Sequence, residues 1–504
     1  MISTADLPDD VDALKAMIVA QSERNDRLET LVASLRQALF GRRSEKSDPD
    51  QFELALEDLE TGIAEVEAER EADPAGAQTR TSKPRATNRG ALPKHLPRIE
   101  EVVEPDSTIC RCGTERHVIG EDVSERLDIV PARFRLIVTR RPKYACRSCE
   151  DGIVQAAAPA HLIPGGMPTE ATIAHVIVSK YADHLPLYRQ AQIYGRQGIE
   201  LDRSTLADWV GRAAFELRPV FDALISDLKK SPKLFMDETR APVLDPGRGK
   251  TKTGYFWALA RDDRAWGGDD PPGVTFTYAP GRSGQYADQI LQDFRGILQV
   301  DGYAGYNRLI RRPSQGIQLA YCWAHARRKL HEVARTGTTP IADEGLRQIT
   351  ALYRIEKEVR GESPARRLAA RQERSKPALE AFGTWLTANR ARVSAKSPLG
   401  EALKYIAKYW DGLCLFLTDG RIEMDSNPVE RTIRPIALNR KNALFAGHDA
   451  GAQNWAIMAS LIETCKLNAV DPHAWLTETL TAIVNGHRQA NIKALLPWNH
   501  QPKV

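Results

Sequence analysis

The chain has 504 residues, which is too long for a single hydrophobic core and predicts roughly three or four domains. Its 70 Lys and Arg residues nearly balance 66 Asp and Glu residues, and this formal net charge of +4 excludes a uniformly basic surface, so any nucleic-acid-binding surface must come from local clustering of basic residues. No apolar run reaches the ~20 residues that span a bilayer, and the acidic N-terminus does not resemble a signal peptide, so we expect a cytoplasmic protein.

The first predicted element is a helix over residues 11–39. Gln21 and Asn25 occupy its two central steps, as in coiled coils whose polar residues set register or partner number. We therefore expect residues 1–48 to self-associate and the protein to form a homo-oligomer, although the helix could instead pack on its own chain. Its apolar positions recur at the alternating steps of three and four that are typical of a heptad repeat, and they are Val11, Leu14, Ile18, Leu28, Val32, Leu35 and Leu39.

Residues 49–100 are predicted to join this helix to the next domain. The stretch 51–72 is acidic and helical in pattern. The stretch 80–98 contains Lys and Arg but no acidic residue, with Pro and Gly throughout. Such a composition is typical of a flexible basic linker. It could touch DNA phosphates without sequence preference, or it could be a plain solvated linker.

Four of the seven cysteines lie in two pairs within residues 101–157. Two such pairs resemble a zinc ribbon, in which four thiolates hold Zn²⁺ and the metal stabilises a small domain with little apolar core. The first pair has only one intervening residue, which makes a tighter knuckle than usual, so His117 is an alternative ligand. The expected zinc ligands are Cys110, Cys112, Cys146 and Cys149.

Residues 158–229 are helical in pattern and contain a candidate helix-turn-helix. One helix is followed by a turn at Gly198 and by a second helix, which we expect Ser204 to cap. The second helix would bury Leu206, Trp209 and Val210 and present Arg203, Thr205 and Asp208 on its outer face. We expect Arg203 and Thr205 to contact DNA. Any two-helix corner gives a similar pattern, so a purely structural helix pair is the alternative.

From Lys233 the pattern changes to strands. Three strands are predicted, ending at Asp237, Asp262 and Pro280, followed by a helix over residues 283–294 and a fourth strand that stops before Asp301. Three sequential strands form an antiparallel meander, and a helical crossover returns the fourth strand parallel to the first and beside it. Asp237 and Asp301 should then meet at the same edge of the sheet.

This pairing of aspartates predicts a metal-dependent catalytic centre of the ribonuclease H-like kind. Carboxylate oxygens suit Mg²⁺ or Mn²⁺, and two such ions activate the attacking oxygen and stabilise the leaving oxygen in phosphodiester transfer. We interpret residues 230–330 as the first part of this catalytic core. For Asp301 the alternative is a residue that only forms the turn.

The rest of the chain is predicted to complete the core after a helical interruption. A fifth strand is expected over Ile317–His325, followed by a helical insertion over residues 331–420. Residues 421–448 should then supply the helix that carries a third acid. Residues 449–504 are helical in pattern and form a C-terminal region.

Glu430 is the preferred third acid. Asn427 as the N-cap and Pro428 as the first helical residue would place Glu430 at the third position of its helix. Asn-x-x-Glu also resembles a capping box, which is the structural alternative, and Glu423 and Asp425 are rival acids. The segment also contains four basic residues that suit a phosphate-lined site better than a bare helix start, namely Arg431, Arg434, Arg440 and Lys441.

Four of these motifs together resemble a known family. "FMDET", "LQVDGYAGY", "CWAHARR" and "DSNPVERTIRPIALNRKNALFAG" are similar to the insertion sequence 66 family of bacterial DDE transposases. The resemblance implies a multidomain α/β protein. Its ribonuclease H-like mixed sheet would be split by an all-α insertion and preceded by a coiled-coil helix, a small zinc-binding β domain and a helix-turn-helix.

The resemblance also implies a reaction and its residues. Asp237, Asp301 and Glu430 would be the catalytic triad that binds Mg²⁺ or Mn²⁺. The protein would bind the ends of an insertion sequence and catalyse DNA cleavage and strand transfer into target DNA, with accessory proteins of the same element as further partners. A nuclease without strand transfer and a catalytically idle DNA-binding regulator are the alternatives. Cys322 and His325 resemble a Cys-x-x-His motif of other transposases, and we expect them to serve in packing or in a contact near the site.

Overall fold

A five-stranded mixed sheet organises the part of the chain that the computed structural model describes, which makes this a mixed α/β protein. The described residues are Val102 and 133–501, except 145–152, 246–249, 311–315, 336, 338 and 444–445. The strand order in the sheet is β5-β4-β3-β6-β7. The strands are β3 (Lys233–Asp245), β4 (Lys250–Arg261), β5 (Gly273–Ala279), β6 (Gly296–Val300) and β7 (Ile317–Tyr321).

The pairing of these strands follows the predicted meander and crossover. β4 pairs antiparallel with both β3 and β5. Helix α6 (Gly284–Ile290) follows β5 and leads to β6, which runs parallel to β3 with Phe235 opposite Gln299. β7 pairs parallel to β6. Because β3 and β6 are parallel neighbours, the residues that follow Phe235 and Gln299 lie at the same end of the two strands.

Two strand ends differ from the sequence prediction by more than one residue. β3 does not end at Asp237 but continues to Asp245, because its backbone pairs with β4 along the whole hairpin. The run of apolar residues ends near Asp237, where the side chains cease to be fully buried. The backbone of β3 nevertheless stays paired beyond that residue. The fifth strand ends at Tyr321 rather than at His325, because Cys322 is the N-cap of helix α8 (Trp323–Ala334).

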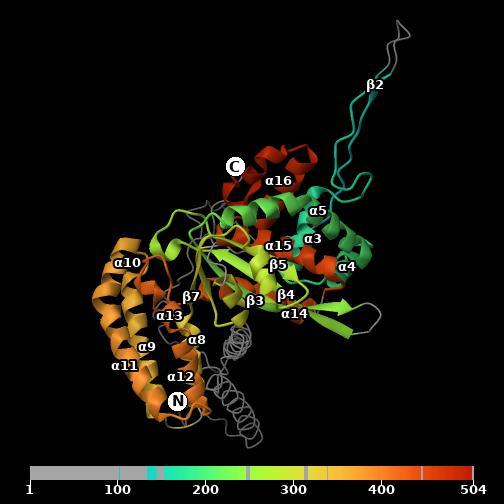
Figure 1. Cartoon of the computed structure of the whole chain (residues 1–504). Coiled ribbons are helices and arrows are strands. Elements are labelled where there is room, and N and C mark those ends of the chain that lie inside the picture. The colour runs from blue at the N-terminus through green and yellow to red at the C-terminus, as the bar shows by residue number, and fades with distance from the viewer. Residues whose placement is uncertain are drawn as a thin grey trace, which may run out of the picture. The chain divides into compact units, whose positions relative to one another are not determined.

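Helices that precede and follow the sheet in sequence share one hydrophobic core with it. α5 and α15 pack against β5, as Figure 1 shows in green and red. This core joins residues of the segments 158–229, 230–330, 421–448 and 449–504. The helices are α3 (Glu170–Tyr181), α4 (Leu187–Gly195), α5 (Arg203–Leu228), α14 (Asn427–Ala443), α15 (Asp449–Leu467) and α16 (Pro472–Val484).

The outer edge of β5 is covered by hydroxyl groups of α15. The Phe276 N–H donates to Ser460 Oγ at 2.7 Å, and the Val274 N–H donates to Thr464 Oγ1 at 3.2 Å. The Thr464 hydroxyl in turn donates to the Val274 carbonyl at 3.0 Å. These contacts satisfy backbone groups that would otherwise be free to pair with another strand.

A second core lies among the helices between β7 and α14. Trp323, Phe382 and Leu403 are fully buried in it, and it also includes Ile297 of β6 and Ala320 of β7. Figure 1 shows α9, α11 and α12 side by side in orange. The helices after α8 are α9 (Pro340–Val359), α10 (Pro364–Ala370), α11 (Lys376–Arg392), α12 (Pro398–Lys408) and α13 (Trp410–Cys414).

The candidate helix-turn-helix consists of α4 and α5, which are joined by a turn. Gly198 lies in the turn at φ +77°, a conformation that glycine adopts without steric penalty. The N-cap of α5 is Asp202 and not Ser204, because the helix already begins at Arg203. The far end of α5, including Leu228, is buried in the core shared with the sheet.

Several predicted features lie outside the described residues. These are the coiled-coil helix, the stretches of residues 49–100, and the zinc ligands Cys110, Cys112, Cys146 and Cys149 with the alternative His117. β1 (Lys143–Tyr144) pairs antiparallel with β2 (Val154–Gln155). No helix of the described residues is long and apolar enough to cross a membrane.

Candidate active site

Asp237 is a half-buried residue in the first half of β3. Its Oδ1 accepts a hydrogen bond from the Glu238 N–H at 2.7 Å. Burial raises the pKa of Asp237 well above its usual range, and the neighbouring carboxylates of Asp301, Glu238 and Glu430 raise it further. The three acids predicted from sequence therefore lie near enough for Asp301 and Glu430 to disfavour the ionised form of Asp237.

Asp301 immediately follows β6 and is level with Asp237. β3 and β6 pair Phe235 with Gln299, and each aspartate lies two residues further along its strand. Oδ1 of Asp301 accepts a hydrogen bond from the Tyr303 N–H at 2.8 Å, which is the geometry of an Asx-turn. The turn-forming role and the proximity to Asp237 thus belong to the same side chain.

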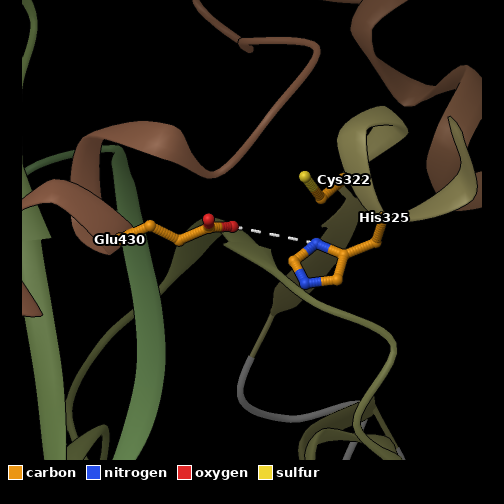
Figure 2. A group of neighbouring side chains, drawn as sticks. All are labelled: Cys322, His325 and Glu430. Carbon is orange, nitrogen blue, oxygen red and sulfur yellow. Dashed lines mark ion pairs between the residues drawn. The ribbon is translucent and has the colours of Figure 1, made fainter. Parts of the chain in front are cut away.

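Glu430 lies near the N-terminal end of α14. This helix already includes Asn427, so Glu430 is one position later than the predicted third position. Asn427 is not the N-cap that the alternative capping box requires, and Oε1 of Glu430 accepts a hydrogen bond from Ser426 Oγ at 3.1 Å instead. The same oxygen lies 3.8 Å from Nδ1 of His325, as Figure 2 shows.

Glu423 and Asp425, the two other candidates for the third acid, form contacts elsewhere. Glu423 accepts a hydrogen bond from Arg367 at 2.9 Å. Asp425 Oδ1 accepts a hydrogen bond from the Asn427 N–H at 3.2 Å at the start of α14. Burial raises the pKa of Asp425. Both acids therefore stabilise the segment that leads into α14.

That segment is tied to β6 through one side-chain amide. Gln299 of β6 is buried, and its Nε2 donates to the Glu423 carbonyl at 2.8 Å. The Glu423 N–H donates back to Gln299 Oε1 at 2.9 Å. Because Asp301 follows the same strand, this pair of hydrogen bonds fixes the approach to Glu430 relative to Asp301.

A buried arginine ties the same segment to the second core. Arg371 donates to both carboxylate oxygens of Glu356 at 2.7 Å. It also donates to the backbone carbonyls of Phe416, Asp419 and Ile422 at 3.0, 3.1 and 2.8 Å. The helices of the second core therefore hold the loop from which α14 starts.

Sequence reasoning did not identify three residues beside the aspartates. Glu238 has no exposed side-chain surface. Its Oε2 accepts a hydrogen bond from Tyr306 Oη, and its Oε1 accepts one from Arg282 Nε, both at 2.7 Å. Burial raises the pKa of Glu238. The sequence did contain a signal, because a second acid directly follows Asp237 in "FMDET", but the pattern places it on the opposite face of the strand.

The predicted DNA-binding residues lie on two helices. Arg431, Arg434 and Lys441 are exposed along α14. Arg440 donates to Thr239 Oγ1 at 3.2 Å and to the Arg240 carbonyl, so its guanidinium group is held against β3. Arg203 is exposed and Thr205 is half-buried at the start of α5, apart from the basic residues of α14.

Two donor sets could hold metal ions. Asp237, Asp301 and Glu430 offer only carboxylate oxygens, which suit a hard divalent cation. Cys322, His325 and Glu430 place one sulfur, one nitrogen and one oxygen atom within 4.8 Å of one another (Figure 2). Cys322 and His325 are neighbours in the sequence, whereas Glu430 reaches them only through the fold.

Family models match almost every segment of the chain. The model described as the transposase IS66 family matches residues 165–454. One described as Transposase C of IS166 homeodomain matches residues 27–100, and a zinc-finger binding domain of transposase IS66 matches residues 107–150. The IS66 C-terminal element matches residues 460–498.

Three curated relatives from Sinorhizobium fredii align over most of their lengths. The uncharacterized protein y4qI is 43% identical over 539 residues, covering 100% of this chain and 99% of the relative. The uncharacterized protein y4jD is 44% identical over 502 residues, covering 98% and 97%. A third, y4hP, is 38% identical over 493 residues, covering 94% and 88%.

Proposed function

The chain belongs to the transposase IS66 family, and on this premise we propose that it binds the ends of an insertion sequence and catalyses metal-dependent DNA cleavage and strand transfer. The observation that carries the proposal is that two carboxyl groups, Asp301 at the end of β6 and Glu430 on α14, both act electrostatically on Asp237 of β3. Burial raises the pKa of Asp237, and Asp301 and Glu430 raise it further. A carboxyl group whose pKa is raised beside other acids is typical of a functional site.

The fold supports the same proposal. An antiparallel meander followed by two parallel strands is the strand arrangement of a ribonuclease H-like core. In this interpretation residues 230–330 and 421–448 form the core, and residues 331–420 are the helical insertion that interrupts it. Residues 449–504 then complete the core by covering the edge of β5.

The residues present fit Mg²⁺ or Mn²⁺ at the proposed catalytic triad. Asp237, Asp301 and Glu430 supply oxygen donors only, and a divalent cation would relieve the repulsion that raises the pKa of Asp237. When bound, such ions supply Lewis-acid stabilisation of charge on the reacting phosphate oxygens.

The protein's own groups would position the DNA for two successive steps. First, water cleaves the phosphodiester at the end of the element and frees a 3′-hydroxyl. This hydroxyl then attacks a target phosphodiester in line, so the protein forms no covalent intermediate. Arg431, Arg434 and Lys441 would bind backbone phosphates beside the triad, and Arg440 would line the same surface from its place against β3.

Recognition of the element ends would use other segments. The zinc-finger segment would hold Zn²⁺ through Cys110, Cys112, Cys146 and Cys149. Arg203 and Thr205 at the start of α5 would contact DNA. The N-terminal heptads would pair two copies of the chain, so that both ends are held together.

The test is a reaction of the purified protein with labelled element ends, a plasmid target and Mg²⁺ or Mn²⁺. We expect cleavage at the 3′ end and a joined product. Asp237→Asn, Asp301→Asn and Glu430→Gln should each abolish both while leaving binding of the ends near that of the wild type. Asp425→Asn is the matched control, because asparagine keeps the oxygen that accepts the Asn427 N–H, and it should remain active.

The same reaction separates the alternatives. Cleavage without a joined product would identify a nuclease, and binding of the ends without cleavage would identify a DNA-binding regulator. If Asp425→Asn abolished cleavage and Glu430→Gln did not, the assignment of the third acid would be wrong.

A further inference from the structure

Three side chains of different donor chemistry converge where the N-terminal ends of α8 and α14 meet. The sulfur of Cys322, a ring nitrogen of His325 and a carboxylate oxygen of Glu430 all lie within 4.8 Å of one another (Figure 2). A tetrahedral zinc ion keeps such donors about 3.3–3.6 Å apart, so side-chain shifts of about 1 Å would bring all three onto one ion. We propose that Cys322, His325 and Glu430 bind a transition-metal ion of the Zn²⁺ type, separate from the four cysteines of the zinc-finger segment.

The local sequence places two of the donors on one face of α8. Cys322 is the N-cap of this helix and His325 lies three residues later, a spacing that puts their side chains next to each other. Glu430 approaches from the first turn of α14. The two helix N-termini also favour negative charge, which suits a thiolate and a carboxylate.

Ser426 orients two of the three donors from outside the cluster. Its backbone N–H donates to Cys322 Sγ at 3.3 Å, and its hydroxyl donates to Glu430 Oε1 at 3.1 Å. Ser426 is itself buried. Hydrogen bonds of this kind fix the direction of metal ligands and stabilise their anionic forms.

His325 supplies an independent observation. Its Nδ1 is buried and, among the described residues, has no hydrogen-bond partner. This nitrogen faces Glu430 Oε1 at 3.8 Å, which is too long for a hydrogen bond. An unpaired buried ring nitrogen costs free energy, and a cation between His325 and Glu430 would remove that cost.

The donor types select the ion. Thiolate and imidazole favour Zn²⁺ over Mg²⁺, whereas Asp237 and Asp301 offer only oxygen. Glu430 belongs to both sets, and the contacts to Ser426 and His325 engage its Oε1. Its Oε2 would then be the oxygen left to ligate the metal ion of the aspartates. The zinc site does not require the proposed DNA chemistry, since it is defined by its own donors.

Zinc content of the full-length protein tests this proposal. Each protein is equilibrated with excess Zn²⁺, freed of unbound metal by gel filtration and measured by mass spectrometry of the elements. Cys322→Ser and His325→Gln should each contain one equivalent of zinc per chain fewer than the wild type. Cys414→Ser is the matched control, because it makes the same change at a half-buried cysteine outside the cluster and should lose none.

Two further variants keep the result interpretable. Ser426→Ala removes hydrogen bonds but no ligand, and should keep the equivalent that Cys322→Ser loses. In full-length protein carrying Cys110→Ser, Cys112→Ser, Cys146→Ser and Cys149→Ser, added Co²⁺ should give the charge-transfer absorption of a thiolate, and adding Cys322→Ser should abolish it. This readout does not depend on comparing the stabilities of different variants.

The proposal is overturned if Cys322→Ser and His325→Gln bind as much zinc as the wild type, or if the Co²⁺ absorption survives Cys322→Ser. Asp237→Asn should retain all the zinc of the wild type. Loss of cleavage and loss of zinc are therefore measured separately, and failure of this proposal is distinguishable from failure of the proposed function.

Discussion

Ionising a carboxyl group that is buried beside other carboxyl groups costs free energy, and Asp237 is such a group. In the unfolded chain an aspartate loses its proton near pH ~3.9. In the folded protein the pKa of Asp237 is raised, first by burial and then by Asp301 and Glu238. Between these two values the native state binds more protons than the unfolded state, so the free energy of unfolding falls as pH rises.

Asp237→Asn should therefore stabilise the metal-free protein at neutral pH. Asparagine removes the charge and keeps an oxygen that accepts the Glu238 N–H. For a unit of this length each kcal/mol gained corresponds to a rise in melting temperature of about 1 °C, and the gain should shrink as pH is lowered toward 4. Scanning calorimetry from pH 5 to 8 measures both effects.

The control for this experiment is Asp208→Asn. Asp208 forms an ion pair with Arg212 in which both side chains are 53% exposed, so its loss should change stability by less than about 1 kcal/mol. Millimolar Mg²⁺ should raise the melting temperature of the wild type more than that of Asp237→Asn. A variant that melts below the wild type at pH 7 would contradict the electrostatic account.

The loop before α14 has no regular secondary structure. It is held in place by the side chain of Gln299 from β6. Gln299→Ala would leave the N–H and carbonyl of Glu423 unpaired, at a cost of about 1–3 kcal/mol for each buried group. The variant should also lose cleavage activity, because α14 would no longer be fixed relative to Asp301. Urea unfolding and the cleavage reaction measure the two effects.

Gln318→Ala is the matched control for Gln299→Ala. Gln318 lies on the neighbouring strand β7, opposite Ile297, and its side chain is exposed. Its removal should leave stability within about 0.5 kcal/mol and activity unchanged. Equal losses from the two substitutions would show that the amide contact to Glu423 has no special role.

Arg371 of the second core also holds the loop before α14, through hydrogen bonds to backbone carbonyls. Arg371→Met should destabilise the protein by about 3–5 kcal/mol, because it leaves Glu356 short of a buried partner and removes the guanidinium donor from three carbonyls. Arg374→Met is the comparison, since Arg374 pairs with Glu358 where both side chains are about half exposed. Solvent screens that exposed pair, so Arg374→Met should change stability much less than Arg371→Met, and denaturant unfolding of both variants would decide.

Elements with a clear periodic pattern could be predicted from the sequence, and their contacts could not. The meander, the crossover and the position of Asp301 follow from alternating apolar residues and a helical interval. The pattern reports burial rather than backbone pairing, which is why β3 was predicted to stop at Asp237. The apolar pattern also extended the predicted fifth strand into Cys322. Cys322 is the N-cap of α8, but it is not one of the residues (Ser, Thr, Asp or Asn) that mark a helix start in the sequence.

The candidate site could be predicted only in part, because some of its contacts join residues that are far apart in the sequence. Asp237 and Asp301 are fixed by the register of two neighbouring strands, which the sequence pattern constrains. Glu430 depends on hydrogen bonds that join residues more than a hundred positions apart, such as Gln299 with Glu423. No local pattern encodes such a contact. Glu238 was missed because its partners Tyr306 and Arg282 come from other segments.

At the scale of the whole molecule, the C-terminal helices belong to the same core as the sheet. Trp455, Leu461 and Trp475 are almost completely buried in that core. Deleting residues 449–504 should therefore unfold the unit Phe134–Val504 rather than remove a separate module. Loss of cooperative thermal unfolding would be the expected result.

Deletion of residues 1–46 is the contrasting case. These residues lie outside that unit, so its cooperative unfolding should be preserved. If the heptads pair two chains, light scattering should show a smaller assembly than the full-length protein forms. A truncation of residues 449–504 that still melts cooperatively at the wild-type temperature would show that α15 and α16 are dispensable for the fold.

The hydroxyl groups of Ser460 and Thr464 also restrict how copies of the protein can meet. By occupying the backbone groups of Val274 and Phe276, they make the outer side of β5 unavailable for strand exchange between molecules. Two copies of the protein therefore cannot fuse their sheets into a continuous ribbon through β5. Any association through this side of the sheet is left to side-chain surfaces, which can separate again.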